Sequence, residues 1–240
     1  MSDGRIIVVS GGSRGIGATT CRRLIEQGYC VIALSRGVPS FEGVIHEYCD
    51  LSDSSTRQDI FHSVAKRYDV YGLVNNAGIA TPNNISEFDK KVYSDVLDLN
   101  ATAVAELSAA LVPSMMRRNE GRIINISSEL ILGFASRTAY SASKAAVASF
   151  AKTWALELGQ YNICCNAIAP GPVETELFKS NNPLGSDIRK KKLAKIPLGR
   201  FGSTSDIAGV VNFLMSREAG FITGQTIYVC GGSSLGSVPF

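Results

Sequence analysis

Histidine is scarce in this sequence. His46 and His62 are the only two histidines among 240 residues, and the six cysteines form no C-x-x-C pair. The sequence therefore lacks the usual ligand spacing of a zinc site, and we expect no bound metal and reduced, mostly buried thiols. The shortage of histidine also argues against a Ser-His-Asp hydrolase, because no third group stands at a recognisable spacing.

Charge of one sign and long hydrophobic runs are lacking as well. The 24 Lys and Arg residues nearly balance the 21 Asp and Glu residues, and a net charge of +3 is too small to favour nucleic acid or an anionic membrane as a partner. No run of 18 or more apolar residues is present to cross a bilayer, and the N-terminus carries no export signal. We expect a cytoplasmic protein.

Short apolar strands and longer helical segments alternate along the chain. Strands are expected at 5–10, 30–35, 44–49, 122–126, 163–167 and 225–229, and a further strand is expected to end at residue 75. Helices are expected at 18–27, 52–68, 89–118, 139–158 and 206–216, with Pro113 a break or bend in the long one. This order predicts a doubly wound parallel α/β sheet of the Rossmann type with about seven strands, in one domain over residues 1–240.

A glycine-rich turn follows the first expected strand directly. Gly11, Gly15 and Gly17 lie between that strand and a helix, in the spacing G-x-x-x-G-x-G. Glycines there let a pyrophosphate approach the backbone, and the helix N-terminus offers free N–H donors. Taken alone, the turn is also compatible with a plain strand-to-helix connection.

The segment Tyr140-Ser141-Ala142-Ser143-Lys144 contains a second pattern with chemical meaning. Tyr140 and Lys144 are four residues apart and share one face of a helix. An ammonium beside a phenol stabilises the phenolate, so Tyr140 is a candidate general acid or base.

Together with four further motifs, these patterns resemble the short-chain dehydrogenase/reductase family. The further motifs are Asn75-Asn76-Ala77-Gly78, Asn100, Asn125-Ile126-Ser127-Ser128 and Pro170-Gly171-Pro172-Val173-Glu174-Thr175. The segments 196–202 and 231–235 resemble the 3-oxoacyl-carrier-protein-reductase-like branch. The resemblance covers nearly the whole chain.

The resemblance implies a dinucleotide cofactor along the carboxyl edge of the sheet. The residues expected to bind it are Gly11, Ser13, Arg14, Gly15, Ile16, Gly17, Arg36, Asp50, Leu51, Asn76, Ala77, Gly78, Tyr140, Lys144, Pro170, Gly171, Val173 and Thr175. Arg36 ends the second strand, where a carboxylate would bind a ribose 2′-hydroxyl, and Arg14 lies in the glycine turn. Two guanidinium groups near one ribose favour NADP, unless they are solvated surface arginines.

The resemblance also implies a catalytic set of Asn100, Ser128, Tyr140 and Lys144. Tyr140 would donate the proton, Lys144 would lower the pKa of Tyr140 and hold the nicotinamide ribose, the serine would bind the carbonyl oxygen, and Asn100 would anchor a water. Counting back from Tyr140 favours Ser127, whereas counting from the start of its strand favours Ser128. We choose Ser128, which implies a one-residue deletion within 129–139, and expect Ser127 to be a cap or core hydroxyl.

Several residues depart from the family pattern. Glu129 is an acid beside the candidate serine, and solvent or a structural partner is favoured over the substrate mouth. Cys230 stands where many relatives have Asp, with no functional explanation. Residues 178–197 are expected to form a mobile lid, with Lys190-Lys191-Lys192 a solvated helix face rather than a substrate clamp.

The sequence thus predicts an NADPH-dependent ketoreductase that acts on a small or carrier-protein-bound 3-oxoacyl thioester. Tyr161 weakens the carrier-protein part, because relatives that bind the carrier often have Arg there. The alternatives are a reductase or dehydrogenase of a free ketone, sugar or steroid, and a catalytically idle redox sensor. Apolar and small residues within 89–118 and 139–158 favour a homotetramer.

Overall fold

Seven apolar segments form one parallel sheet in the computed structural model, which describes residues 4–236. The strands are β1 Ile6–Ser10, β2 Cys30–Ser35, β3 Val44–Tyr48, β4 Val70–Asn75, β5 Gly121–Ile126, β6 Ile163–Pro170 and β7 Thr226–Val229. Their order is β3-β2-β1-β4-β5-β6-β7, so the direction of winding reverses between β1 and β4. The predicted doubly wound Rossmann-type sheet is confirmed, and ligands of such sheets bind beyond the carboxyl ends of the strands at this reversal.

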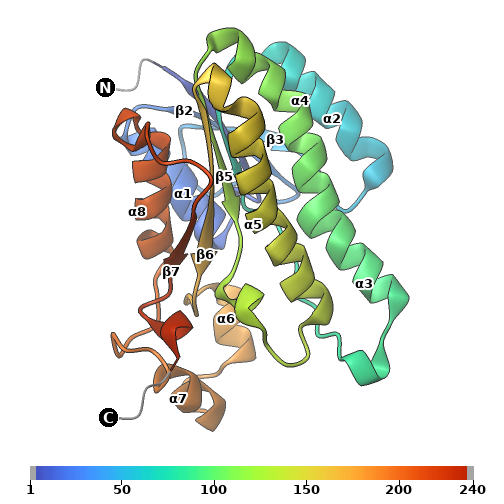
Figure 1. Ribbon diagram of the computed structural model, residues 1–240, viewed down its shortest axis with the longest axis vertical. Coiled ribbons are helices and arrows are strands. Elements are labelled where there is room, and N and C mark those ends of the chain that lie inside the picture. The colour runs from blue at the N-terminus through green and yellow to red at the C-terminus, as the bar shows by residue number, and fades with distance from the viewer. Residues whose placement is uncertain (1–3, 237–240) are drawn as a thin grey trace.

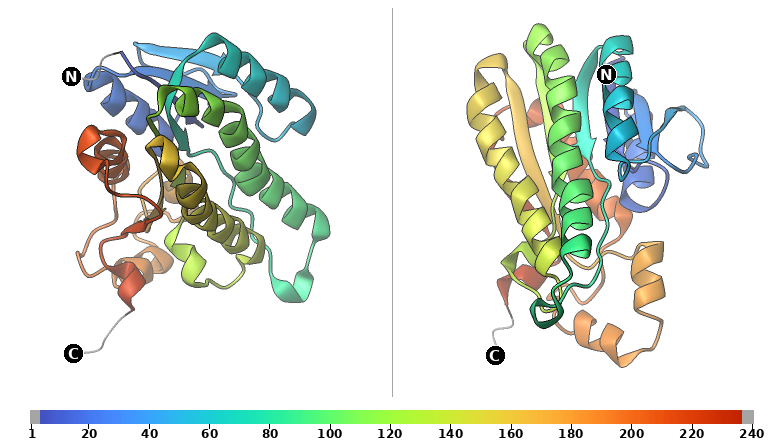
Figure 2. Two further views of the ribbon diagram at one scale, coloured as in Figure 1. Left: turned by 45° about the horizontal axis from the view of Figure 1, so that its top comes forward. Right: turned by 90° about the vertical axis from the view of Figure 1, so that its right-hand side faces the viewer.

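Helices cover both faces of the sheet (Figure 1). One face carries α1 Gly15–Glu26 and α8 Thr204–Met215, and the other carries α2 Ser54–Arg67, α4 Ala103–Arg118 and α5 Thr138–Leu158. The short helices α6 Glu176–Asn181 and α7 Asp187–Leu193 lie together beyond the carboxyl edge, as both views in Figure 2 show. Shorter helical turns are η1 Ile85–Glu87, η3 Glu129–Leu132, η4 Gly159–Tyr161, η5 Arg217–Ala219 and η6 Ser233–Leu235.

Alternation along the strands divides the hydrophobic core into two layers. Ile7 and Val9 of β1 pack with α1 and α8, whereas Val8 points to the layer beneath α2 and α4. Both layers are fully buried at β1, where these three side chains have 0% exposure. Residues 1–3 and 237–240 of the expected domain lie outside the described residues.

Pro113 does not break the long helical region, contrary to our prediction. It lies inside α4, and both Pro113 and Ala109, whose carbonyl loses its helical partner, are exposed to solvent. Water can therefore bind the freed carbonyl. The irregularity lies upstream instead, in the π-helical segment η2 Asp98–Thr102 between α3 Lys90–Leu97 and α4.

One helical stretch is apolar enough to cross a membrane by length and composition alone. It is the continuous region Lys90–Arg118. An 18-residue window within this region has a mean hydropathy of 1.3, and 44% of that window is buried inside the fold. A core helix of a soluble protein passes the same test. Its inward residues Leu107 and Leu111 pack in the layer beneath α2 and α4, so the apolar character has an explanation within the fold.

None of the six cysteines forms a disulfide. Cys21, Cys49, Cys164 and Cys165 are buried, and burial raises the pKa of the Cys21 and Cys165 thiols to about 12. These thiols are protonated core side chains at neutral pH. Within the part of the chain that the structure describes, no group of three or more His, Cys, Asp and Glu side chains could hold a metal ion.

Candidate active site at the carboxyl edge of the sheet

The motifs singled out in the sequence converge because each one follows a strand of the same parallel sheet. The glycine turn follows β1, Asn76 follows β4, Ser128 follows β5 and Gly171 follows β6. Parallel strands end at one edge, which Figure 1 shows facing α6 and α7. Tyr140 and Lys144 reach the same edge from the first two turns of α5.

The glycine turn packs too closely against Asn76 to admit side chains. A Cβ at Gly17 would lie 2.1 Å from the Gly11 carbonyl oxygen, and Gly11 itself has a φ of +68°. Asn76 Nδ2 donates to the carbonyl oxygens of Ser10 (3.0 Å) and Gly11 (3.2 Å). Asn76 therefore holds the turn in place, and the side chain of the N-cap residue Arg14 does not cap the start of α1, where helix N–H groups are suited to an anion.

Ser10 is a site residue that the sequence reading missed. Its buried hydroxyl accepts hydrogen bonds from the backbone N–H groups of Asn76 (3.0 Å) and Ala77 (3.1 Å). Ser10 thereby joins the end of β1 to the start of the Asn76–Gly78 segment. A serine closing an otherwise apolar strand was the available signal.

The two predicted phosphate-binding arginines occupy the same corner of the molecule. Arg36 is 63% exposed, and its Nη1 lies 3.7 Å from Asp50 Oδ2. Arg14 is exposed at the N-terminus of α1 and lines a cleft of about 260 Å³ with Arg22, Ser40 and Lys179. Gly37, the residue after Arg36, lies so close to the glycine turn that its Cβ would be 3.4 Å from Ser13 Oγ.

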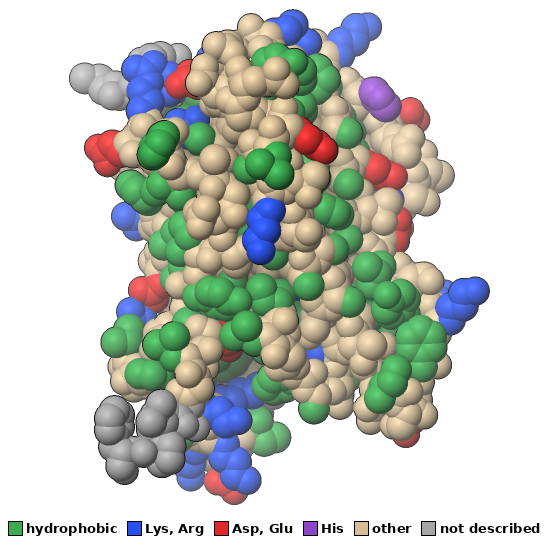
Figure 3. Space-filling model, viewed as in Figure 1, with side chains coloured by type: hydrophobic (Ala, Val, Ile, Leu, Met, Phe, Trp, Pro, Cys, Tyr) green, Lys and Arg blue, Asp and Glu red, His purple; other side chains and the backbone are tan. Residues whose placement is uncertain are grey.

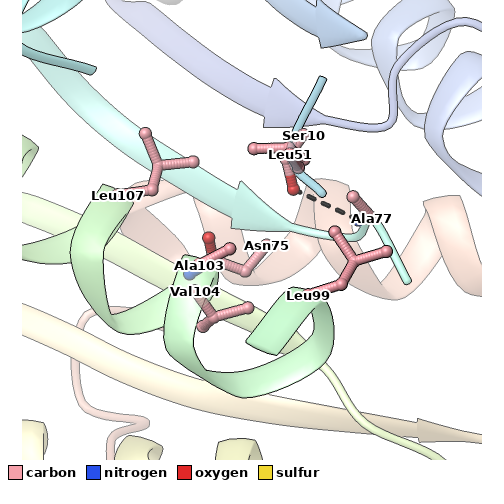
Figure 4. Close-up of a pocket in the computed structure, with 8 residues that line it drawn as sticks. All are labelled: Ser10, Leu51, Asn75, Ala77, Leu99, Ala103, Val104 and Leu107. Carbon is pink, nitrogen blue, oxygen red and sulfur yellow. Dashed lines mark hydrogen bonds between the residues drawn. The ribbon is translucent and has the colours of Figure 1, made fainter. Parts of the chain in front are cut away.

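Asp50 is held in a turn by Ser52. Its Oδ1 accepts from the Ser52 N–H (3.0 Å) and Oγ (2.6 Å), and these bonds, together with the Arg36 charge, lower the pKa of the Asp50 carboxyl. The following residue, Leu51, is buried and helps to line a cavity of about 10 Å³. Figure 4 shows Leu51, Ala77 and Leu99 pointing toward that cavity from three different segments.

Asn100 is fully buried in the π-helical segment. Its Nδ2 donates to Ile79 O (2.9 Å) and Ser143 Oγ (3.0 Å), and its Oδ1 accepts from Ile79 N (2.9 Å). Ser143 Oγ in turn donates to Tyr140 O at 2.8 Å, so Asn100 contacts the helix that carries the Tyr-Lys pair. Ser143 was missed from the sequence, although it lies inside that motif. π-Helical segments often occur at functional sites.

Lys144 is a buried ammonium with one hydrogen-bond partner among the residues that the structure describes. Its Nζ donates to Ile126 O at 2.8 Å, and the residue is 4% exposed. Burial without a carboxylate partner lowers the pKa of Lys144 to about 8. A Cβ at Gly78 would lie 3.3 Å from this Nζ and 3.0 Å from Asn100 Oδ1, so a glycine makes room for both groups.

The pKa of Tyr140 moves in the opposite direction to our prediction. Burial raises the pKa of the Tyr140 phenol, while a hydrogen bond with Ser128 and the charge of Arg137 oppose that rise. Lys144 Nζ lies 5.9 Å from the centre of the Tyr140 ring, and it does not offset the effect of burial. The phenol is therefore protonated at neutral pH.

The two candidate serines point to different neighbours. Ser128 Oγ accepts from Leu130 N at 3.2 Å and contributes the hydrogen bond to Tyr140. Ser127 Oγ instead donates to Lys144 O at 2.8 Å, in the interior between β5 and α5. Ser128 is among the groups that shift the pKa of the Tyr140 phenol, which favours Ser128 over Ser127 as its neighbour.

The segment after β6 approaches β7 and the glycine turn. A Cβ at Gly171 would lie 2.7 Å from Cys230 Cα, and the Gly171 N–H donates to Val229 O (3.0 Å). Val173 forms an isolated bridge with Gly202, and Thr175 caps α6 through the Phe178 N–H. A methyl of Thr175 comes within 3.6 Å of the Cβ position of Gly15, so this segment borders the same cleft.

The expected lid, 178–197, consists mainly of α6 and α7, and side-chain contacts join it to its surroundings. Arg189 pairs with Glu174 and lies 4.6 Å from the Phe201 ring centre. Lys192 is not simply solvated, because its Nζ donates to Asn182 Oδ1 at 2.7 Å. Lys190 faces solvent beside Asp187.

The two other residues that depart from the family pattern, Glu129 and Cys230, both contact residues of η6. Glu129 has a structural partner there, because it accepts a hydrogen bond from Ser233 Oγ, and burial raises the pKa of its carboxyl. Cys230 Sγ lies 3.2 Å from Ser234 Oγ.

These residues fit a dinucleotide. The glycine turn packs closely on Asn76 and carries no side chains at Gly11, Gly15 and Gly17, so a ligand can approach its backbone. The N–H groups opening α1 are suited to a pyrophosphate, and Lys144 can donate to a ribose. The exposed Arg14 and Arg36 lie at the corner where the second strand ends.

Comparison with known proteins identifies relatives over nearly the whole chain. The family model described as "Enoyl-(Acyl carrier protein) reductase" matches residues 11–234. A protein from Vibrio cholerae named 3-oxoacyl-[acyl-carrier-protein] reductase FabG is 35% identical over 240 residues, 96% of this chain and 97% of its own. Its Escherichia coli namesake is 33% identical over 241 residues, with the same coverage of both chains.

Solved structures of oxidoreductases also resemble this chain over nearly its whole length. A putative NAD(P)-dependent gluconate 5-dehydrogenase from Beutenbergia cavernae with bound NADP is 30% identical, with a TM-score of 0.91 over 96% of each chain. Aldohexose dehydrogenase from Thermoplasma acidophilum is 31% identical, with a TM-score of 0.89 over 98% of this chain and 97% of its own. A protein titled "short chain dehydrogenase/reductase family protein" superposes with a TM-score of 0.87 over 97% of this chain and 98% of its own, at 31% identity. With matches that cover nearly the whole chain at 30–35% identity, the chain belongs to the short-chain dehydrogenase/reductase family.

Proposed function

We propose that this protein is an NADPH-dependent ketoreductase that converts a 3-oxoacyl thioester, or a similar carbonyl compound, to a secondary alcohol. One observation supports this most directly: Ser128 and Tyr140 place two hydroxyl groups together at the edge where the glycine turn would hold a dinucleotide. Two hydroxyl donors suit an oxygen acceptor such as a carbonyl.

The protonation states suit reduction. NADPH, when bound, supplies the hydride. Tyr140 gives its phenolic proton to the alkoxide oxygen that develops, and its raised pKa keeps that proton available at neutral pH. Ser128 hydrogen-bonds the same oxygen. Lys144, with a pKa lowered to about 8, can pass a proton toward Tyr140 near neutral pH, and Asn100 fixes the start of α5 on which both residues lie.

The substrate class follows from the relatives. The Vibrio cholerae and Escherichia coli proteins are named for 3-oxoacyl groups on a carrier protein, and we propose an acyl thioester for this chain. Tyr161, where carrier-binding relatives often have Arg, favours a substrate not held by the carrier. The structural neighbours named for gluconate and aldohexose keep a free sugar or ketone as the alternative. A panel of β-ketoacyl thioesters and free ketones, assayed by NADPH oxidation, decides between them.

An idle redox sensor is disfavoured. A redox sensor does not require a buried Lys144, whose burial without a carboxylate partner among the described residues destabilises the fold. It does not require the Ser128–Tyr140 pair either. We also propose a cytoplasmic location, consistent with six free thiols.

Tyr140→Phe removes the proton donor while keeping the ring. Turnover of ketone should fall at least ~10²-fold, the scale of general-acid catalysis, and NADPH binding should survive. Steady-state kinetics and fluorescence titration measure the two effects. Tyr161→Phe, the same change outside the site, serves as the control. Near-normal turnover by Tyr140→Phe would refute the mechanism.

The two serines should differ in their effect. Ser128→Ala removes a donor to the substrate oxygen and should lower kcat on the order of 10²-fold. Ser127→Ala removes only the bond to Lys144 O and should cost much less. Parallel kinetics of the two variants test the assignment, and the reverse ranking would show that Ser127 is the substrate-binding serine.

NADPH should bind at least tenfold more tightly than NADH, about 1.4 kcal/mol, because Arg14 and Arg36 can pair with a 2′-phosphate. Arg36→Asp should reverse or abolish the preference. Arg117→Asp makes the same charge change in the last turn of α4, toward the opposite edge of the sheet, and should leave the preference intact. Isothermal titration of both nucleotides provides the measurement, and equal affinities in the unmodified protein would contradict the assignment.

We further propose a homotetramer. α5 exposes Leu156 (88%), and Phe150 stacks on Trp154 with ring centres 5.1 Å apart. Figure 3 shows hydrophobic side chains scattered over the face that carries α5, with one Lys or Arg side chain near its middle and most other charges toward its rim. Such a face suits symmetric self-association.

Light scattering should give about four times the chain mass of 25.6 kDa. Leu156→Glu should lower that mass, whereas Leu184→Glu, equally exposed on the loop between α6 and α7, should not. A concentration-independent mass near 25.6 kDa for the unmodified protein would rule the assembly out.

A further inference from the structure

Arg57 is a buried guanidinium outside the catalytic set. It lies in the first turns of α2, is 1% exposed, and is among the largest fully buried side chains of the described residues. Nε donates to Glu106 Oε2 (2.6 Å), Nη1 to Asp98 Oδ2 (2.5 Å) and Leu51 O (3.0 Å), and Nη2 to Asp98 Oδ1 (2.8 Å). Four of the five N–H groups of an arginine are thus used.

The partners of Arg57 come from segments that border both ends of the site. Leu51 follows Asp50 and lines the cavity of Figure 4. Asp98 opens the π-helical segment, and its neighbour Leu99 lines the same cavity. Leu51, one of the residues expected to bind the dinucleotide, and the segment carrying Asn100 are therefore bound to one guanidinium.

The contact with Asp98 extends to the catalytic helix. Asn100 lies two residues after Asp98 and bonds to Ile79 and to Ser143 Oγ. Ser143 bonds to Tyr140 O and directly precedes Lys144. A shift of the π-helical segment would thus move the amide that fixes the start of α5.

The geometry of these bonds resists such a shift. The two nearly parallel bonds from Nη1 and Nη2 to the Asp98 carboxylate fix its angle as well as its distance. Displacement of either Leu51 or Asp98 would leave an N–H of a buried cation without a partner, which is strongly unfavourable.

We propose that Arg57 is a positioning residue: through Asp98 it holds the Asn100 segment in its working position, and through Leu51 it fixes the expected dinucleotide-binding segment Asp50–Leu51 relative to it. The expected kinetic effects rest on the proposed ketoreductase function. The positional claim itself does not, because it concerns the hydrogen bonds of Asn100.

Glu106 provides a matched control within the same cluster. Glu106 and Asp98 each give a carboxylate to the same guanidinium, and both are partly exposed, at 26% and 37%. Glu106 lies in regular α4, however, whereas Asp98 opens the π-helical segment. Asp98→Asn and Glu106→Gln therefore remove one carboxylate charge each from beside Arg57. Asp98→Asn weakens a two-bond contact with the Asn100 segment, whereas Glu106→Gln weakens a one-bond contact outside it.

The first measurement is hydrogen exchange of the Ile79 amide, which donates to Asn100 Oδ1 (2.9 Å), in full-length protein without nucleotide. Asp98→Asn should speed this exchange at least about tenfold, because local opening of the segment becomes easier. Glu106→Gln should change it less than about threefold. Equal exchange in the two variants would overturn the proposal, whatever reaction the protein catalyses.

The second measurement is kcat per NADPH-binding site and KM for NADPH, at a temperature where circular dichroism shows each variant folded. Asp98→Asn should lower kcat about tenfold with little change in KM, Asp98→Glu should recover part of the loss, and Glu106→Gln should stay near the unmodified value. Arg57→Lys keeps the positive charge but not the planar guanidinium that bonds to Asp98, Glu106 and Leu51 at once, so it should lower kcat and raise KM together.

Matching kcat values for Asp98→Asn and Glu106→Gln would reduce Arg57 to a stabilising residue and overturn the proposal. If no substrate is turned over by the unmodified protein, the proposed function fails, and the exchange of the Ile79 amide still decides the role of Arg57. Should Arg57→Lys not fold, the two carboxylate variants decide alone.

Discussion

The site is arranged around an ammonium ion that is buried with no carboxylate partner among residues 4–236. Lys144 Nζ donates one hydrogen bond to a carbonyl oxygen of β5, and a Cβ at residue 78 would crowd the same nitrogen at 3.3 Å. That crowding explains the glycine at position 78, and the bond from Ser127 to the Lys144 backbone fixes the helix turn that carries the ammonium. The depressed pKa is the direct energetic result of the same burial.

The second constraint is the meeting of several backbones at one sheet edge. The glycine turn, the start of α1 and Asn76 approach so closely that a methyl group at Gly17 would overlap the Gly11 carbonyl. The segments after β6 and β7 also approach closely, because a Cβ at Gly171 would lie 2.7 Å from Cys230 Cα. Backbone amides, rather than side chains, therefore form much of the surface offered to a nucleotide, which suits phosphate groups.

Local patterns in the sequence were sufficient to predict the strands and a parallel sheet, because runs such as 6–9 and 30–34 are apolar on both faces. They were insufficient where distant residues decide the conformation. The π-helical segment exists where Asn100 bonds to Ile79 and Ser143, and Pro113 is tolerated because its side of α4 faces water. The choice between Ser127 and Ser128 depended on strand register, and the pKa of Tyr140 on burial that no spacing reveals. Arg57 left no signal in the sequence, because its partners lie 6, 41 and 49 positions away.

The stacked pair Phe150–Trp154 has a practical consequence, since Trp154 is the only tryptophan in the chain. All indole fluorescence therefore originates from one point on α5, the same helix that carries Tyr140 and Lys144. Emission from this protein is a single-site spectroscopic probe that needs no label. Its wavelength reports the polarity at one helix face of each chain, and its quenching by a reduced nicotinamide reports that the nucleotide is bound.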